Sequence, residues 1–209
     1  MAGRIIETMA DVAEGTSWLA RRDAGMARAL DCAGLPPLRR RPDGFAALRD
    51  AICGQMVSTA AARAMIARLD AAGLADGPAV AAAGDAALVA CGLSRAKARH
   101  LLGIAESEFV INSLRHVADA EVQARLVALP GVGRWTAEIY AITALGRADV
   151  FAPGDLALRE AVRRLYGLPD RPAVAELSRR AAAWSPWRAV AARLLWAYYR
   201  SVREREGLA

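Results

Sequence analysis

Residues 129–141 read LPGVGRWTAEIYA, and the fold is decided here. Pro130 stops the helix before it, while Gly131 and Gly133 permit a positive φ and a close approach of another backbone. From Thr136 onward, residues recur at helical spacing. The stretch therefore predicts two helices joined by a short glycine hairpin.

The start of the second helix is a suitable place for a phosphate group. The first N–H groups of a helix have no acceptor within it, and the helix dipole adds positive charge at that end. Such amides can hold a phosphate whatever the base sequence. From these residues alone, the helix pair is either a grip for one DNA strand or a corner that only packs.

The composition is that of a folded, basic protein. Hydrophobic residues make up 55% of the 209, the formal net charge is +6 and the pI is near 9.9, which favours a polyanionic partner such as nucleic acid. No run approaches the roughly eighteen apolar residues of a membrane span, and no signal peptide is evident. We expect a soluble cytoplasmic protein.

Cysteine and histidine offer little for metal chemistry. Cys32, Cys53 and Cys91 are too far apart in sequence for a CxxC or four-cysteine site, so we expect them to be reduced and buried. His100 and His116 are the only histidines and lack metal-ligand spacing. A zinc site or a histidine-based catalytic site is not expected.

Strand signals are almost absent, whereas helical periodicity recurs throughout, which predicts an all-α protein. The segment PPLRRRPDG at 36–44 is the best linker candidate. Breakers and capping residues predict helices at about 4–13, 17–33, 44–54, 58–72, 78–83, 85–91, 94–113, 119–128, 134–146, 155–166, 173–183 and 187–205.

Asp155 follows an apolar segment and precedes a predicted helix. As a helix N-cap it would contribute about 0.5–2 kcal/mol to stability. As a functional group, its ionised carboxylate would stabilise positive charge developing on a sugar and orient or deprotonate a water molecule. The residues alone allow both roles.

The string LPGVGRWTA, followed at this distance by Asp155, resembles the helix-hairpin-helix motif of the DNA glycosylase superfamily that includes endonuclease III. The resemblance implies a two-lobed helical fold with an interlobe cleft for a flipped base. One lobe would span 45–147, with the helix-hairpin-helix at about 119–146, and the second would combine 1–44 with 148–209. It also implies that Asp155 is the catalytic carboxylate.

Bifunctional members of this superfamily carry a lysine where this chain has Trp135. The only lysine, Lys97, belongs to a different predicted helix, where we expect it to be exposed or to face a phosphate. The resemblance therefore implies a monofunctional enzyme without AP lyase activity. Since no cysteine quartet lies near the C-terminus, it implies no iron–sulfur cluster and no required cofactor.

Trp135 together with ICGQMVS at 52–58 is similar to the DNA-3-methyladenine glycosylase II branch, which acts on alkylated bases of the 3-methyladenine and 7-methylguanine type. In this branch the residue after the glutamine is an apolar wedge that enters the duplex where the damaged nucleotide leaves, which implies that role for Met56. The alternative is that Met56 is a core methionine between two helices. Gln55 would lie near the gap. Further DNA contacts would come from Gly131, Gly133 and Arg134.

The resemblance implies a base pocket lined by Trp135 and Trp196, with Tyr140 as a neighbour. An aromatic face attracts a cationic alkylpurine by about 0.5–2 kcal/mol. Both tryptophans would otherwise be core residues. Ile139 and Ala197 stand where better-known members have tyrosines, so the range of substrates is not carried over.

The superfamily's hairpin commonly holds a monovalent cation through backbone carbonyls, which here would be those of Val127, Leu129 and Val132 and would bind Na⁺ or K⁺. The expected partner is damaged double-stranded DNA, bound by a monomer at the bacterial nucleoid. Two alternatives stay open: a non-catalytic helix-hairpin-helix lesion binder, and a glycosylase for mismatched or deaminated bases.

Overall fold

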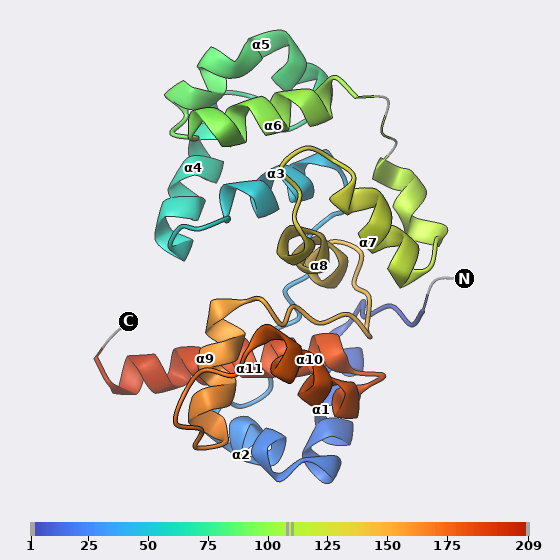
Figure 1. Cartoon of the computed structure of the whole chain (residues 1–209), viewed down its shortest axis with the longest axis vertical. Coiled ribbons are helices and arrows are strands. Elements are labelled where there is room, and N and C mark those ends of the chain that lie inside the picture. Colours follow the sequence, from blue (N-terminus) through green and yellow to red (C-terminus); the bar gives the residue numbers. More distant parts are fainter. Residues whose placement is uncertain (1–2, 108, 110, 208–209) are drawn as a thin grey trace. The chain divides into compact units, whose positions relative to one another are not determined.

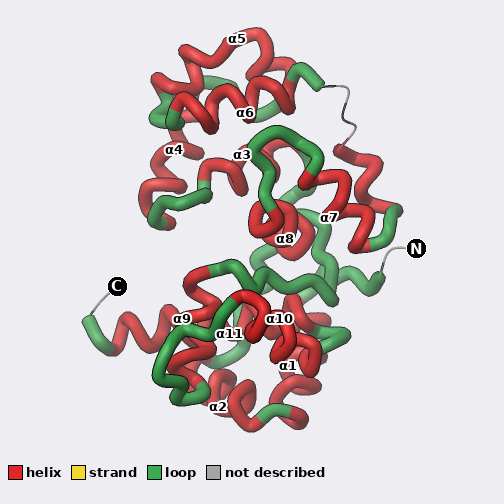
Figure 2. Tube along the Cα trace, in the orientation of Figure 1, coloured by secondary structure: helices red, strands yellow, loops and turns green. Residues whose placement is uncertain are grey.

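The computed structural model describes residues 3–107, 109 and 111–207 (Figure 1). In that part of the chain, Figure 2 shows helices and loops without a strand, and the one β-pairing is an isolated bridge between Ile5 and Arg147. The all-α prediction is confirmed. The elements are α1 (Met9–Arg22), α2 (Ala24–Ala33), α3 (Phe45–Cys53), α4 (Thr59–Ala71), α5 (Gly77–Ala90), α6 (Arg95–Ala105), η1 (Ile111–His116), α7 (Asp119–Val127), α8 (Arg134–Thr143), α9 (Leu156–Leu165), α10 (Val174–Ala181), η2 (Ala182–Trp184) and α11 (Arg188–Arg205).

The helices nearest the N-terminus differ from those predicted. The predicted helix at 17–33 is interrupted at Asp23, which has extended backbone and accepts the N–H groups of Gly25 and Met26 at 2.8 and 3.2 Å. The predicted helix at 4–13 instead begins at Met9, after the N-cap Thr8. In both cases a short polar side chain binds the backbone amides and fixes the start of a helix, which apolar periodicity does not reveal.

The predicted helix at 94–113 is too long. Helix α6 ends at Ala105, where the Ser107 hydroxyl donates to the Ile104 carbonyl at 2.7 Å, and the turns at 111–116 are of 3₁₀ type. The predicted positions 108 and 110 lie outside the described residues. The break predicted between 83 and 85 is present within α5 as Gly84, with φ +73° and ψ 178°.

The chain divides into two compact units. Unit 1 comprises Arg41–Leu145, and unit 2 comprises Gly3–Arg40 together with the chain from Gly146 onward. The predicted central lobe ran from 45 to 147. At the ends of unit 1, the Arg41 N–H donates to the Thr143 carbonyl at 2.9 Å. Among the described residues, no helix combines the length and apolar character that crossing a membrane requires.

In unit 1, α3 packs against α4, α6 and α8, and α7 packs against α8 (Figure 1). Its core includes Leu48 and Ile52 from α3, Leu101 from α6 and Ile142 from α8, each essentially without solvent exposure. This core holds the ends of α3, α6 and α8 close together, and the functional side chains of the unit lie at those ends.

In unit 2, Asp23 connects the N-terminal helices to the C-terminal ones. Its Oδ2 accepts the Tyr166 hydroxyl at 2.7 Å and the Trp184 indole N–H at 2.9 Å. Burial alone would raise the pKa of Asp23, but the hydrogen bonds from Trp184, Tyr166 and the amides outweigh it and lower that pKa. A Cβ on Gly25 would lie 2.5 Å from the Tyr166 ring, so only glycine allows this contact.

We predict that Asp23→Asn lowers the free energy of unfolding by about 1–3 kcal/mol at neutral pH, because it removes the charge from two side-chain hydrogen bonds. A carboxylate with a lowered folded pKa stabilises the protein above its ordinary pKa of 3.8, and this contribution is lost as the pH falls through the folded value. The deficit measured by urea unfolding should therefore shrink below pH 3.8. An equal deficit at every pH would contradict this account.

Candidate functional site

The turn between α7 and α8, residues 128–133, is called the hairpin below. Gly131 has φ +71°, and a Cβ there would lie 2.1 Å from Nδ1 of His100, so the position requires glycine. Gly133 differs from the expectation: its φ is −82°, which any residue can adopt. A Cβ on Gly133 would meet nothing within 4 Å, so this exposed glycine leaves open space in front of α8.

The start of α8 is suited to binding an anion. Six described helices, α1, α2, α4, α5, α6 and α9, begin with a side chain that accepts a backbone N–H. Helix α8 has Gly133 as its N-cap and no side-chain cap, as is also the case for α3, α7, α10 and α11. Its first amides therefore have no side-chain acceptor at an exposed helix end. Backbone amides in this arrangement bind phosphate.

Arg134 is anchored beside these amides. Its Nε donates to Oε1 of Glu138 at 2.8 Å, one turn further along α8. Glu138 is buried, and burial raises its pKa although Arg134 opposes the shift. The Arg134 side chain itself is 64% exposed. A buried carboxylate thus orients an exposed cation at the helix end expected to bind DNA.

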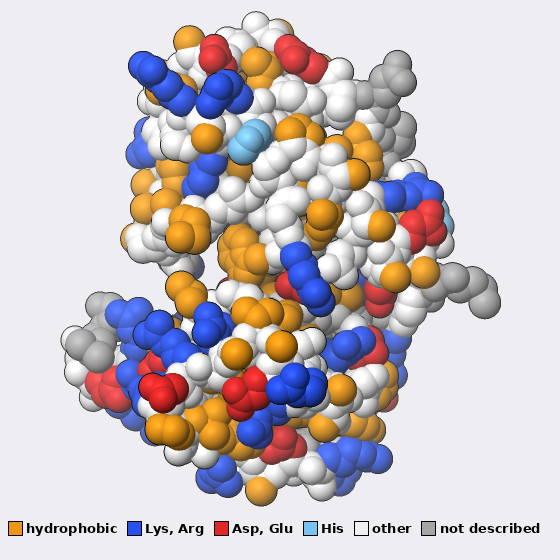
Figure 3. Space-filling view, in the orientation of Figure 1, with side chains coloured by type: hydrophobic (Ala, Val, Ile, Leu, Met, Phe, Trp, Pro, Cys, Tyr) orange, Lys and Arg blue, Asp and Glu red, His pale blue; other side chains and the backbone are white. Residues whose placement is uncertain are grey.

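The turn between α3 and α4, residues 54–57, is called the wedge turn below. Met56 is 98% exposed, so it is not a core methionine, and its φ of +54° is rarely adopted by a side chain of this size. Val57 is also exposed. On the face drawn in Figure 3, hydrophobic side chains gather at the surface over α4, the helix that follows this turn. Left-handed backbone at a residue of this kind costs about 1–3 kcal/mol and persists only where its surroundings impose it.

Gln55 joins the wedge turn to the hairpin. Its Nε2 donates to the Gly131 carbonyl at 3.0 Å and to the Thr136 hydroxyl at 2.8 Å. The amide nitrogen expected near a DNA gap is therefore engaged by the hairpin. Trp135, which is half-buried, also reaches the wedge turn, since its ring lies 3.8 Å from the Cβ position of Gly54.

The expectation that Lys97 is exposed or faces a phosphate is wrong. Its Nζ donates to the carbonyls of Cys53 at 3.0 Å and Gln55 at 2.7 Å. Lys97 is half-buried, and desolvation lowers its pKa. In the sequence, Lys97 lies more than thirty residues from both ICGQMVS and LPGVGRWTA, so its contact with the end of α3 could not be predicted.

Asp155 caps α9 and contacts a predicted pocket residue. Its Oδ1 accepts the Leu158 N–H at 3.0 Å and the indole N–H of Trp196, from α11, at 3.2 Å. The Arg39 guanidinium lies 5.6 Å from the centroid of the Trp196 ring. The packing of α9 against α11 thus brings the predicted carboxylate and tryptophan together within unit 2. Leu156, 58% exposed directly after Asp155, adds an apolar surface that the sequence did not single out.

The prediction that Tyr140 lines the base pocket is wrong. Tyr140 is 1% exposed in the core of unit 1, and its hydroxyl accepts the Gly44 N–H at 3.1 Å. Burial raises the pKa of this hydroxyl to about 12. The ring and the hydroxyl therefore support the start of α3.

The carbonyls expected to hold a cation come from a helix end and the following turn. Val127 is the last residue of α7, where carbonyl oxygens lack helical partners, and the Leu129 carbonyl accepts the Val132 N–H at 3.2 Å. Among the described residues, no group of three His, Cys, Asp or Glu side chains could hold a metal. Neutral oxygen donors of this kind fit a hard, weakly charged cation.

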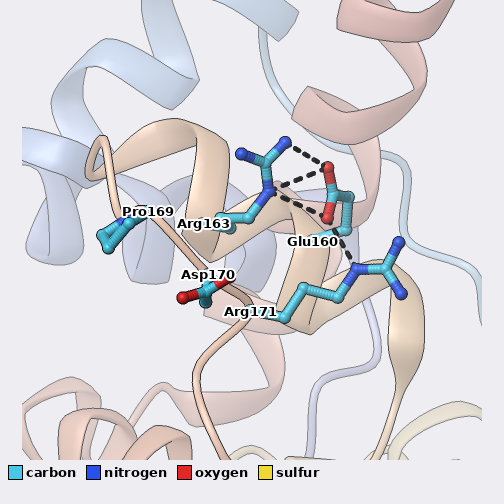
Figure 4. Close-up of a pocket in the computed structure, with 5 residues that line it drawn as sticks. All are labelled: Glu160, Arg163, Pro169, Asp170 and Arg171. Carbon is cyan, nitrogen blue, oxygen red and sulfur yellow. Dashed lines mark hydrogen bonds and ion pairs between the residues drawn. The ribbon is translucent and has the colours of Figure 1, made fainter.

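A pocket of about 520 Å³ in unit 2 does not provide a reactive group (Figure 4). It is lined by Glu160, Arg163, Pro169, Asp170 and Arg171. Glu160 Oε1 accepts Arg163 at 2.7 Å, and Oε2 accepts Arg171 at 2.8 Å. These bonds hold the pKa of Glu160 well below its usual range. A carboxylate so firmly paired serves to tie α9 to the loop that follows it.

Comparison with known proteins identifies the family of the chain. Residues 50–187 match the family model described as HhH-GPD superfamily base excision DNA repair protein, and the chain belongs to this family. The matched range includes α7, the hairpin and α8.

Within the family, the named relatives belong to the 3-methyladenine branch. The chain is 32% identical over 161 residues to DNA-3-methyladenine glycosylase 2 of Escherichia coli, covering 70% of this chain and 54% of that protein. It is 31% identical over 93 residues to the putative DNA-3-methyladenine glycosylase YfjP of Bacillus subtilis, covering 44% of this chain and 32% of that one. The chain thus spans about a third to a half of these two relatives.

A solved structure extends the similarity to nearly the whole fold. The 3-methyladenine DNA glycosylase Mag1 of Schizosaccharomyces pombe, in complex with abasic DNA, matches with a TM-score of 0.80 and 26% identity, covering 88% of this chain and 95% of that one. The resemblance inferred from LPGVGRWTA and ICGQMVS is confirmed.

We predict opposite consequences for the two hairpin glycines. Gly131→Ala should destabilise the protein by at least about 2 kcal/mol, because of its positive φ and the contact with His100. Gly133→Ala should leave the melting temperature unchanged and weaken binding to duplex DNA, because its methyl group enters the space in front of α8. Thermal denaturation and fluorescence anisotropy with a labelled duplex measure the two effects. Equal DNA affinity of Gly133→Ala and wild type would argue against a phosphate at α8.

Proposed function

We propose that this protein is a monofunctional DNA glycosylase of base excision repair that removes alkylated bases of the 3-methyladenine and 7-methylguanine type. The observation that carries the proposal is the Asp155 carboxylate at the start of α9, held by the Trp196 indole N–H. The family of the chain and the names of its relatives support the same activity.

Asp155 would act on the sugar of the extruded nucleotide. As the N-glycosidic bond breaks, its electron pair goes to the cationic base, which leaves neutral, while positive charge develops at C1′ of the deoxyribose. An ionised carboxylate stabilises this charge. A water molecule then forms the new bond to C1′, and its proton passes to Asp155 or to solvent, leaving an abasic site.

An alkylated purine already carries the positive charge that makes it a good leaving group, so the reaction needs no general acid. The chain has only two histidines. The protein would instead supply aromatic surface for the cation, from Trp135 and Trp196, and a fixed carboxylate. Trp196 would have two roles: its ring face would contact the cationic base, and its indole N–H donates to Asp155.

The DNA would be held through its backbone at α8 and opened by Met56. The uncapped amides of α8 and the anchored Arg134 provide contacts to phosphate that do not depend on base sequence. Met56, exposed on the wedge turn, would replace part of the stacking lost when the base leaves the duplex. A Na⁺ or K⁺ ion on the carbonyls of Val127, Leu129 and Val132 would bridge the hairpin to a phosphate.

We propose that the protein acts as a monomer on damaged double-stranded DNA of the bacterial nucleoid, without a required cofactor or iron–sulfur cluster. Excision of deaminated or mismatched bases is the second enzymatic possibility, and a lesion binder without chemistry is the third. The next experiment separates the three.

We predict that wild type releases 3-methyladenine and 7-methylguanine from methylated DNA, and that Asp155→Asn reduces the rate by about 100-fold or more, since transition-state charge loses its counterion. Trp196→Phe keeps an aromatic ring but removes the bond to the carboxylate, and should reduce the rate roughly tenfold. Chromatography of released bases measures both, with anisotropy as the control for DNA binding.

Other results of the base-release experiment would favour one of the two alternative functions. Tight DNA binding without release of any base by wild type would favour the lesion binder. Release from deaminated but not from methylated DNA would favour the other substrate class. Full activity of Asp155→Asn would exclude the carboxylate from the reaction.

We predict no Schiff base between protein and DNA. Trp135 occupies the position of the nucleophilic lysine, and Nζ of Lys97 is engaged by two backbone carbonyls. Borohydride should therefore trap no covalent complex during excision, and strand breaks should appear only after alkali. A bifunctional glycosylase from the same superfamily serves as the positive control. A trapped complex that disappears in Lys97→Met would show lyase activity from this lysine.

A further inference from the structure

The wedge turn needs an external restraint. Met56 combines a left-handed backbone with almost complete exposure, so its own side chain gains nothing from packing that could offset the strain. The turn is also the end of α3, where carbonyl groups have no further helical N–H to accept. The conformation must therefore be held by groups outside the turn.

Lys97 meets the turn from α6. Its ammonium donates to the carbonyl of Cys53, the last residue of α3, and to that of Gln55, the residue before Met56. Charge-assisted hydrogen bonds of this kind are shorter and stronger than neutral ones. The two carbonyls flank Gly54, so one cation fixes both the helix end and the direction in which the chain enters Met56.

The choice of lysine is informative in this chain. Of its 28 Lys and Arg residues, only Lys97 is a lysine. An ammonium is a compact donor that can serve two converging carbonyls, whereas the donors of arginine spread in a planar fork. The site is half-buried, and it is the one place where this protein uses the smaller cation.

Gln55 holds the opposite side of the same turn. Its backbone carbonyl accepts Lys97, while its side chain donates to the Gly131 carbonyl and the Thr136 hydroxyl. The restraint therefore runs from α6 through the wedge turn to the hairpin, all within unit 1. A change at Lys97 should reach Met56 without altering the phosphate contacts at α8.

We propose that Lys97 is a positioning residue that holds the wedge turn in the conformation needed to extrude a nucleotide. The inference rests on the proposed glycosylase function. It assigns to Lys97 the task of fixing the wedge turn before the nucleotide is extruded. Lys97 does not touch the substrate in this account. It acts through the backbone of Gln55 on Met56.

A double-mutant cycle tests the proposal. The variants are Lys97→Met, Met56→Ala and the double variant, and the matched control is Arg99→Met, which removes one exposed positive charge from the same helix. Single-turnover excision of a methylated base from duplex DNA is measured for each, with melting temperature as the check on folding. Flipping costs a few kcal/mol, so loss of the wedge should slow excision by about tenfold.

The expected result is non-additivity. Lys97→Met and Met56→Ala should each slow excision about tenfold, and the double variant should be within about twofold of either, because both remove the same step. Arg99→Met should change the rate by less than about twofold. Multiplied losses in the double variant, or a loss in Arg99→Met equal to that in Lys97→Met, would overturn the proposal.

A second measurement separates positioning from general damage and does not require excision. A duplex with 2-aminopurine beside the lesion brightens when the neighbouring base leaves the stack. Lys97→Met should bind this duplex with wild-type affinity and lose most of the fluorescence increase. A parallel loss of affinity and melting temperature with unchanged brightening of the bound fraction would overturn the proposal. If wild type brightens the duplex but excises nothing, the glycosylase proposal fails while the role of Lys97 is still tested.

Discussion

The contact between Gly131 and the ring of His100 is the constraint on which unit 1 depends. Because glycine has no Cβ, the chain can adopt φ +71° at Gly131, lie close to His100 and pass directly from α7 into α8. The carbonyl of the same residue then accepts Gln55, which ties the wedge turn to the hairpin. One position without a Cβ thus fixes the exposed amides of α8 and the location of Met56 together.

Unit 2 uses a helix-capping aspartate twice, with different results. Asp23 and Asp155 each cap a helix and each accept an indole N–H, from Trp184 and Trp196. In Asp23, Oδ1 accepts the backbone amides of the cap, while Oδ2 accepts Trp184 and Tyr166 and joins the two ends of the chain. In Asp155 the cap and the indole both bind Oδ1. Cap geometry alone therefore does not single out a reactive carboxylate, and the family is needed to distinguish the two.

The sequence was sufficient where a feature depends on neighbouring residues. The hairpin, the cap at Asp155 and the helical class follow from local glycine, proline and capping chemistry. Prediction failed where the partner is distant in sequence. Tyr140 follows the predicted pocket residue Trp135 in the same helix but lies in the core. Lys97 contacts the end of α3, more than forty residues earlier in the chain. Gly133 shows a further limit of sequence-based prediction. Its φ of −82° does not require glycine, and the sequence does not distinguish such a glycine from one that a positive φ requires.

Trp135 stands where, by the resemblance, bifunctional members of the superfamily carry a lysine. Its ring also has a structural role in this chain. At the start of α8 the indole ring lies 3.8 Å from the Cβ position of Gly54, so it supports the turn proposed to open the duplex. In the proposed reaction water attacks the sugar as a cationic base leaves, and the face of the Trp135 ring would also attract such a base. Lys97, on the other side of the turn, then has its amine fixed by carbonyls. An amine held in this way fits the proposed release of the base by water.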